Sequence, residues 1–142
     1  MKMTVINPGS LGQPKGYSNG ILFEGGSLLF IAGQIGWDHD QRIVSDDFAD
    51  QFGQALSNVL AVVHEAGGGP QNIARLLIFV TDKDEYASER RGVGVVYRQL
   101  MDRHFPAMTL VEVSSLLEPL AKVEIEAMAV IPTAENPTGN PQ

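Results

Sequence analysis

Two stretches near the end of the chain decide its fold: HFPAMTLVEV (residues 104–113) and AKVEIEAMAV (residues 121–130). Both are apolar runs of strand length, so we expect two closing β-strands. In the second stretch, small and branched apolar residues alternate with Glu124, Glu126 and Met128. Ionised carboxylates rarely lie unpaired in a dry core. The glutamate face of this strand therefore indicates a cleft or a boundary between subunits.

The rest of the sequence supplies the other elements of one domain. Apolar residues recur at helical spacing in two segments, and glycine and proline interrupt the pattern where elements should end. The expected elements are a strand at 4–6, a hairpin of runs 17–24 and 28–35 around Gly25-Gly26-Ser27, a helix at 48–66, a strand at 74–80, and a helix with Val93, Val96, Tyr97, Leu100 and Met101 on one face.

The element order is then β-β-β-α-β-α-β-β. A helix that joins two strands of one sheet implies a right-handed crossover and a partly parallel arrangement. We therefore expect an α+β fold with a mixed sheet of about six strands and two helices packed on one face. Residues 1–132 form the expected domain, and the polar residues 133–142 form a tail that we expect to be disordered.

Composition and charge exclude several classes of function. The formal net charge is −7 with no basic run, which disfavours nucleic-acid binding. The chain has no cysteine, so disulfides and thiolate chemistry are excluded. Its three histidines, His39, His64 and His104, are too scattered for a metal site, and we expect neither metal nor cofactor. Without a signal peptide pattern or a membrane-length apolar run, a cytoplasmic protein is expected.

Six short strings occur in order along the chain. They are Gly16-Tyr17-Ser18-Asn19-Gly20, Ile31-Ala32-Gly33-Gln34-Ile35, Gln54 to Val59 with Glu65 to Gly68, Phe79-Val80-Thr81-Asp82, His104-Phe105-Pro106-Ala107 and Val123 to Val130. Together these strings resemble the RidA (YjgF) family of reactive-imine deaminases, some members of which are known as L-PSP-type endoribonucleases. They cover residues 16 to 131, nearly the whole domain, so the resemblance implies the fold more strongly than the reaction.

The resemblance implies a chorismate mutase-like domain that forms homotrimers, with a small-molecule cleft between each pair of subunits. In the active deaminases an arginine after Phe-Pro-Ala pairs with the substrate carboxylate. A serine, a cysteine, an asparagine, a tyrosine and a glutamate complete the pocket. The glutamate holds a water that attacks the imine carbon and releases ammonia.

Only part of this set is present here. Tyr17 matches the family tyrosine and Glu124 the glutamate, whereas Met108 replaces the arginine, Ala32 the serine and Leu110 the cysteine. The family asparagine falls near Gly94, beside an apparent insertion at 87–93. Methionine cannot form the paired charged hydrogen bonds of an arginine. We therefore expect a cleft lined by these five residues, poor binding of 2-iminopropanoate, and a preference for a neutral or cationic ligand.

Each candidate residue also has an ordinary structural interpretation. Glu124 could lie on a solvated strand face, Tyr17 could pack at an interface, and Trp37 could belong to a surface loop or to a pocket rim. Arg90 and Arg91 are either solvated or replace the missing cation from a neighbouring copy.

Three functions stay open. The first is hydrolysis or tautomerisation of a small imine, enamine or enol with Glu124 as acid and base. The second is a non-catalytic trimer that binds or senses a small molecule, and the third is an endoribonuclease.

Overall fold

The computed structural model describes residues 1–133. Of the tail expected at 133–142, all but Thr133 lies outside the described residues. The elements of the described part are β1 (Lys2–Ile6), β2 (Gly20–Glu24), β3 (Ser27–Ile35), α1 (Phe48–Glu65), β4 (Ile73–Val80), α2 (Lys83–Ser88), α3 (Arg90–Met101), β5 (Ala107–Glu112) and β6 (Val123–Ile131), with short 3-10 turns at Gly9–Leu11 and Pro70–Asn72.

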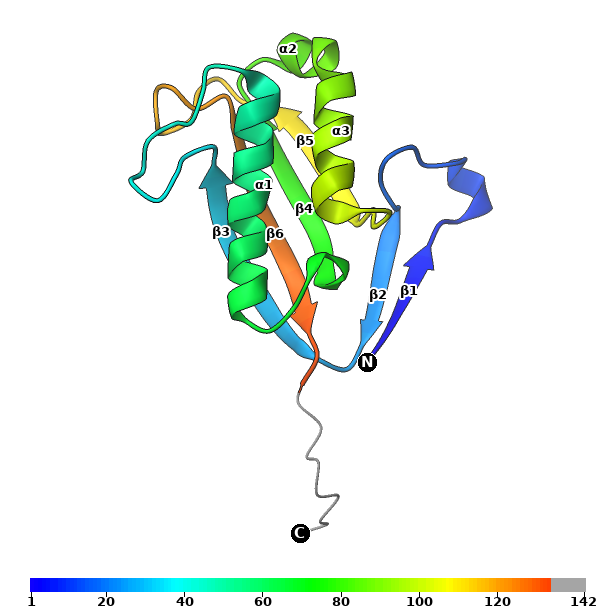
Figure 1. The fold of residues 1–142 in the computed structure, drawn as a ribbon. Coiled ribbons are helices and arrows are strands. Elements are labelled where there is room, and N and C mark those ends of the chain that lie inside the picture. Colours follow the sequence, from blue (N-terminus) through cyan, green and yellow to red (C-terminus); the bar gives the residue numbers. More distant parts are fainter. Residues whose placement is uncertain (134–142) are drawn as a thin grey trace.

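Four strands form the main sheet, in the order β3-β6-β4-β5. Strand β6 runs antiparallel to both neighbours, whereas β4 and β5 are parallel, so the sheet is mixed as predicted. All three helices lie on one side of this sheet (Figure 1). The expected α+β fold with two layers is therefore confirmed.

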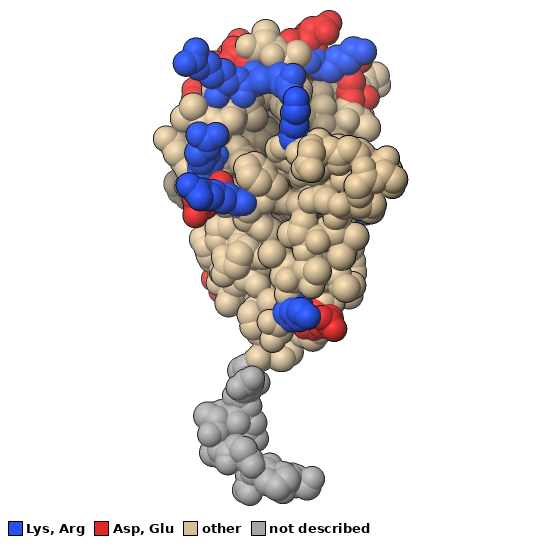
Figure 2. Space-filling view, turned by 90° about the vertical axis from the view of Figure 1, so that its right-hand side faces the viewer, with Lys and Arg blue, Asp and Glu red and all other residues tan. Residues whose placement is uncertain are grey.

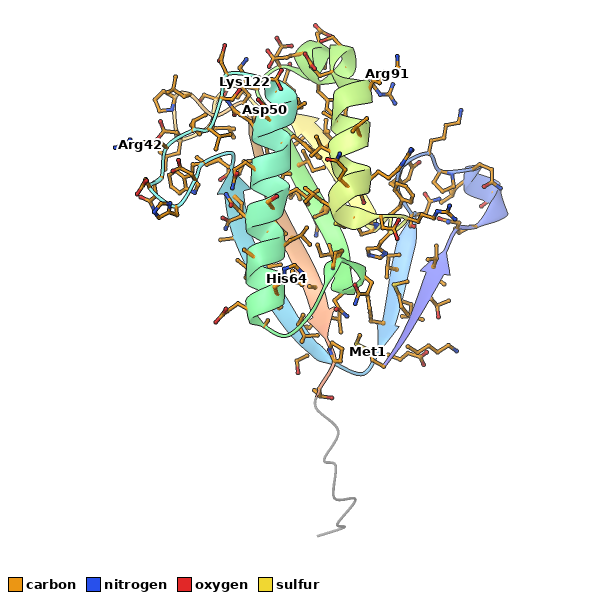
Figure 3. All side chains as sticks on the ribbon, in the orientation of Figure 1. Met1, Arg42, Asp50, His64, Arg91 and Lys122 are labelled. Atoms are coloured by element: carbon orange, nitrogen blue, oxygen red, sulfur yellow. The ribbon has the colours of Figure 1, made fainter. Side chains whose placement is uncertain are left out.

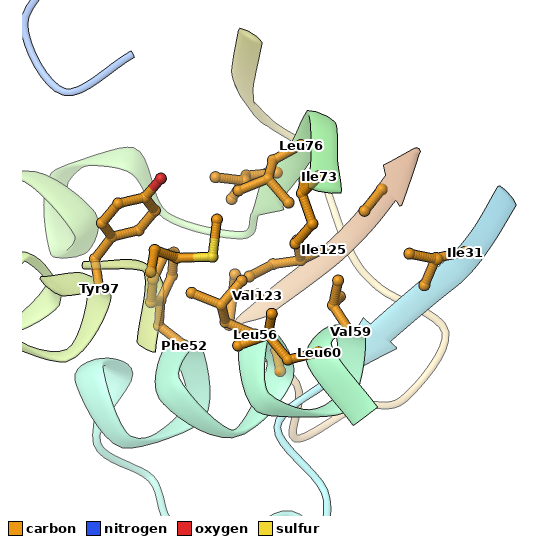
Figure 4. Packing of buried hydrophobic residues seen from close by; sticks show 14 of the residues in the cluster. Ile31, Phe52, Leu56, Val59, Leu60, Ile73, Leu76, Tyr97, Val123 and Ile125 are labelled. Atoms are coloured by element: carbon orange, nitrogen blue, oxygen red, sulfur yellow. The ribbon is translucent and has the colours of Figure 1, made fainter. Parts of the chain in front are cut away.

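The core lies between helix α1 and the sheet. Helix α1 begins after Asp47, whose side chain accepts the backbone N–H of Asp50 over 2.9 Å and so caps the helix. Its buried face carries Leu56 and Val59, which pack towards Val123 and Ile125 of β6 (Figure 4). Burial of such side chains from both layers is the main stabilising contribution to a domain of this size.

The predicted hairpin of 17–24 with 28–35 is wrong. Strand β2 pairs with β1 instead, and these two strands form a separate sheet beside the main one (Figure 1). Two contacts explain the separation. Ser18 donates its N–H and its hydroxyl to the carbonyls of Pro106 and Phe105, next to β5. These hydrogen bonds hold β2 beside β5, at the edge of the main sheet opposite β3. The outer edge of β3 has no partner strand among residues 1–133.

The bend between the two sheets depends on glycine. Gly25 and Gly26 have φ values of 82° and 84°, a region that residues with a side chain rarely adopt. A Cβ at Gly26 would also lie 2.6 Å from Cγ1 of Val130. The glycine pair therefore still marks a turn, as predicted, but the strands that it joins diverge.

The second predicted helix is divided into α2 and α3. Asp82 caps α2 by accepting the N–H groups of Asp84 and Glu85. The chain leaves helical geometry at Glu89, and α3 begins one residue later. The described residues thus contain three α-helices rather than two.

The uncovered face of the main sheet is largely apolar. Leu28 and Phe30 of β3 are 64% and 70% exposed, and Val111 of β5 is exposed on the same face. An exposed apolar sheet face of this kind is typical of a surface that binds a partner and not of one that stays in contact with water. No helix of the described chain is long and apolar enough to cross a membrane.

Gln51 connects the loops around α1. Its side chain is fully buried, its Nε2 donates to the carbonyls of Ser45 and Leu120 over 2.9 and 3.1 Å, and its Oε1 accepts the N–H of Lys122 over 2.8 Å. Gln51 therefore joins the start of α1 to the loop before β6. Each of these backbone groups would lose its partner if the amide were removed.

We expect Gln51→Met to lower the free energy of unfolding by about 3 kcal/mol, because methionine keeps the length of the side chain but leaves three backbone groups unpaired. Urea denaturation measures the change. Gln54→Met is the matched control, since the Gln54 amide donates only to Asn58. Equal losses in the two variants would contradict a special role for Gln51.

Candidate functional site

Glu124 lies on the face of the main sheet that the helices leave uncovered. Its neighbours Val123 and Ile125 point into the core and are fully buried. Strand alternation therefore directs Glu124 to the opposite side, together with Glu126 and Met128. The predicted alternation of β6 is confirmed, and the glutamate face borders open space rather than a closed core.

A small pocket of about 150 Å³ surrounds the Glu124 carboxylate. We call it the acid pocket; its lining residues are Gly33, Ile35, Trp37, Leu116, Leu117, Glu118 and Glu124. Strand β3 has a bulge between Ile31 and Gln34 at this point. A Cβ at Gly33 would lie 2.7 Å from Oε1 of Glu124, so a larger residue at this position would require the glutamate side chain to move.

The loop that carries Trp37 is held against α1. Nδ2 of Asn58 donates to the carbonyls of Ile35 and Trp37 over 3.0 and 2.9 Å. The indole thus lines a pocket beside Glu124, which favours the pocket-rim interpretation of Trp37 over that of an ordinary surface loop. No side-chain hydrogen bond within residues 1–133 involves the Glu124 carboxylate.

Met108 and Leu110 lie on the other face of the sheet. They stand opposite Leu76 and Ile78 of β4, which are buried against the helices. Strand β4 also runs between β5 and β6, so the strand of Glu124 is not adjacent to the strand of Met108. The same face for Met108 and Leu110 was predicted correctly, but a single chain does not bring them to Glu124.

Met108 lines a second and larger pocket, of about 370 Å³, between α3, β5 and the loop before β2. We call it the cation pocket, because Lys15, Arg90 and Arg98 lie on its rim. Its walls are mainly apolar and aromatic. The residues of the walls are Gly16, Phe52, Ile78, Tyr86, Val93, Gly94, Tyr97, Phe105 and Met108.

The three cations of this pocket form no ion pair with an acidic residue of the described part of the chain. The ion pairs of residues 1–133 involve only Lys2, His39 and Lys122 on the basic side. Figure 2 looks onto the side of the molecule that carries α3 and the β1–β2 sheet, and most lysine and arginine side chains in this view lie in its upper half. The pocket is therefore a locally positive site on an acidic protein.

Tyr97 and Phe105 form an aromatic wall of the cation pocket. Their rings are stacked with centroids 5.5 Å apart. The hydroxyl of Tyr97 donates to the carbonyl of His104 over 2.7 Å, and burial raises its pKa. Because this hydroxyl already donates a hydrogen bond and its pKa is raised, Tyr97 is suited to packing rather than to proton transfer.

The remaining predicted site residues lie near, but not in, these pockets. Tyr17 is 41% exposed, whereas its neighbours Lys15 and Gly16 line the cation pocket. Ala32 is exposed beside the bulge of β3, and its carbonyl accepts from the Gln34 amide. Leu110 packs against the core. Each pocket thus contains one of the five predicted residues.

Sequence reasoning missed Lys15 and Arg98. Arg90, Gly94 and Arg98 recur every four residues and so share one face of α3, which is a signal that the sequence does contain. Nothing in the sequence places Lys15 opposite that face, because the contact depends on the anchor at Ser18.

Comparison with known proteins supports one family. Residues 10–131 match the family described as Endoribonuclease L-PSP. The 2-iminobutanoate/2-iminopropanoate deaminase of Salmonella typhimurium is 36% identical over 108 residues, which is 74% of this chain and 80% of the relative.

Two solved structures extend the similarity to the fold. The YyfB protein of the Rid family from Yersinia pestis superposes with a TM-score of 0.82 at 27% identity, covering 92% of this chain and all of that one. The YjgF gene product of Escherichia coli superposes with a TM-score of 0.66 at 31% identity, covering 87% of this chain and 92% of that one. The chain therefore belongs to the Endoribonuclease L-PSP family, whose relatives include the RidA and YjgF proteins.

Proposed function

We propose that this protein acts on a small imine, enamine or enol, by hydrolysis or tautomerisation, in a cleft between two copies of the chain. The observation that carries the proposal is the Glu124 carboxylate, which lines a pocket beside Trp37 and has no hydrogen-bond partner among residues 1–133. A relative that is 36% identical over 108 residues is named 2-iminobutanoate/2-iminopropanoate deaminase. A carboxylate poised beside an open pocket is suited to moving protons.

The two pockets supply different parts of the proposed cleft. The acid pocket carries Glu118 and Glu124, and the cation pocket carries Lys15, Arg90 and Arg98. Because they lie on opposite faces of the sheet, they can meet only if one face of a copy docks against a different face of the next. Head-to-tail contacts of this kind close into rings when the rotation between copies allows it. The proposed assembly is the ring that the family resemblance implies, a homotrimer with three composite clefts.

In this cleft Glu124 would take a proton from a water molecule as that water attacks the imine carbon, and would give this proton to the nitrogen to form a carbinolamine. It would then take the proton of the new hydroxyl group and pass it to the nitrogen as the carbon–nitrogen bond breaks, so that ammonia and a carbonyl compound leave. For an enamine, the same group would first protonate carbon and accept a proton from nitrogen to give the imine. One carboxyl group that is alternately deprotonated and protonated can carry each of these transfers.

Replacement of the family arginine by Met108 would change the substrate rather than the reaction. The serine and the cysteine that the resemblance implies are also absent, with Ala32 and Leu110 at those positions. A non-catalytic binding trimer is the alternative that these replacements favour. The same assay separates the two functions, because a binding protein would retain a ligand and leave its rate of hydrolysis unchanged.

We expect the protein to accelerate hydrolysis of at least one imine by tenfold or more over the spontaneous rate, and to act slowly on 2-iminopropanoate, whose carboxylate Met108 cannot bind. Imines formed in situ from a panel of amino acids by an amino-acid oxidase provide the substrates, and ammonia release provides the signal. If no imine in an aliphatic and aromatic panel decays faster with the protein than without it, the enzymatic proposal fails.

A further inference from the structure

The cation pocket combines an apolar interior with a positive rim. Three of the ten lysine and arginine residues in a chain of net charge −7 lie around it. None of the three pairs with an acid of residues 1–133, although these residues include most of the acids in the chain. Like charges gathered around one pocket repel each other, so the arrangement favours an anion between them.

Helix α3 fixes where two of these cations lie. Arg90, Gly94 and Arg98 share one helix face, and eight residues at 1.5 Å each separate the two arginines by about 12 Å along the axis. Lys15 approaches from the loop on the other side. The stacked rings of Tyr97 and Phe105 line the same pocket.

We propose that the cation pocket binds a carboxylate with a bulky apolar or aromatic body, with Arg98 and Arg90 holding the carboxylate and Met108 contacting the body. The inference rests on the proposed function, because it names the substrate class of the same cleft. It replaces the expectation of a neutral or cationic ligand, which depended on the apolar residues 32, 108 and 110 and on no cation.

Two physical arguments support this class of ligand. A guanidinium group binds a carboxylate through two parallel charged hydrogen bonds. An arginine on α3 would therefore compensate for Met108, which stands where the active deaminases have an arginine. The pocket volume of about 370 Å³ also falls within the range of about 300 to 1,000 Å³ typical of sites for whole metabolites. A three-carbon acid would leave most of the aromatic wall in contact with water.

Gly94 keeps the centre of the pocket open. A Cβ at this position would meet no atom within 4 Å, and its backbone has no positive φ. The glycine is therefore not required by the helix, in which it costs about 1 kcal/mol relative to alanine. Its absence of a side chain instead lets a ligand approach α3 between the two arginines.

Calorimetry with three probes tests the inference. Phenylpyruvate carries both the carboxylate and an aromatic body, pyruvate carries only the carboxylate, and phenylacetone carries the body without the charge. We expect phenylpyruvate to bind at least tenfold more tightly than either of the others. Equal affinities for phenylpyruvate and phenylacetone would overturn the role of the cations, and equal affinities for phenylpyruvate and pyruvate would overturn that of the aromatic wall.

Substitutions locate the site. Arg98→Gln and Arg90→Gln should each weaken phenylpyruvate binding at least tenfold. Arg91→Gln is the matched control, because Arg91 is exposed, does not line the pocket and points away from the protein body (Figure 3). Gly94→Leu should abolish binding without lowering the unfolding temperature. Unchanged binding in Gly94→Leu, or an equal loss in Arg91→Gln, would place the ligand elsewhere.

Light scattering on the same variants removes the main competing explanation. If Glu118 of a second copy neutralised the arginines, the arginine variants would lose assembly rather than affinity, and the inference would be wrong. The outcome is separate from that of the proposed function. Hydrolysis that survives in both arginine variants refutes the carboxylate site alone, whereas tight binding of phenylpyruvate without hydrolysis of any imine refutes the catalytic proposal alone.

Discussion

Glu124→Gln is expected to lower the rate of imine hydrolysis by about a hundredfold to ten-thousandfold, the range typical of removing a general acid–base group. The amide has almost the same shape as the carboxyl group but cannot take or return a proton. Binding of a carboxylate ligand should therefore persist, because the substitution leaves Lys15, Arg90 and Arg98 of the cation pocket unchanged. Ammonia release measures the rate, and calorimetry with phenylpyruvate measures the binding.

Glu126→Gln is the matched control for this experiment. Glu126 lies two residues along the same strand and on the same face, but it borders a different depression that contains Arg75 and Leu77. We expect its loss to change the rate by less than about threefold, since it is remote from the proposed water. Comparable losses in the two variants would show that the glutamate face matters for assembly or charge and not for chemistry at Glu124.

Phe30→Glu is expected to convert the assembled protein into monomers. Phe30 is 70% exposed in a single chain and lies on the uncovered face of the sheet, next to Leu28 and Met128. In the proposed trimer the substitution would bury an unpaired charge in each copy, which costs several kcal/mol, and about 4 kcal/mol corresponds to a thousandfold weaker association.

Light scattering at micromolar concentration detects this change, and loss of hydrolysis should accompany it if the cleft is composite. Val95→Glu provides the comparison, because Val95 is also exposed and apolar but lies on α3, on the helical layer. A monomeric wild-type protein, or a Phe30→Glu variant that stays assembled, would refute the trimer and with it the shared cleft.

The sequence predicted those features of the fold that depend on local periodicity. Helix α1 and strand β6 were predicted because the spacing of Leu56, Val59, Val123 and Ile125 reflects which side each residue buries. The break at Glu89 was not predicted, because the apolar face continues through it and only the backbone leaves helical geometry. The spacing of apolar side chains indicates which residues are buried, but it does not reveal a one-residue break in the backbone of a helix.

The pairing of β2 shows a different limit of prediction from sequence. A glycine pair between two apolar runs favours a hairpin, and the local signal for one is present at Gly25 and Gly26. The structure overrides this signal through a contact 87 residues away, between the Ser18 hydroxyl and the carbonyl of Phe105. The same contact brings Lys15 to the cation pocket, so one unpredicted hydrogen bond accounts for both the wrong hairpin and the missed cation.

Strand β6 is the last element of the described chain to be synthesised, yet it lies between β3 and β4. Until residue 131 has left the ribosome, those two strands have no common partner and α1 lacks much of the surface on which it packs. Folding of the sheet therefore waits for the synthesis of residues 123–131, and a nascent chain that stops before residue 123 exposes its apolar strands. Chains in this condition are the ones that chaperones protect from aggregation.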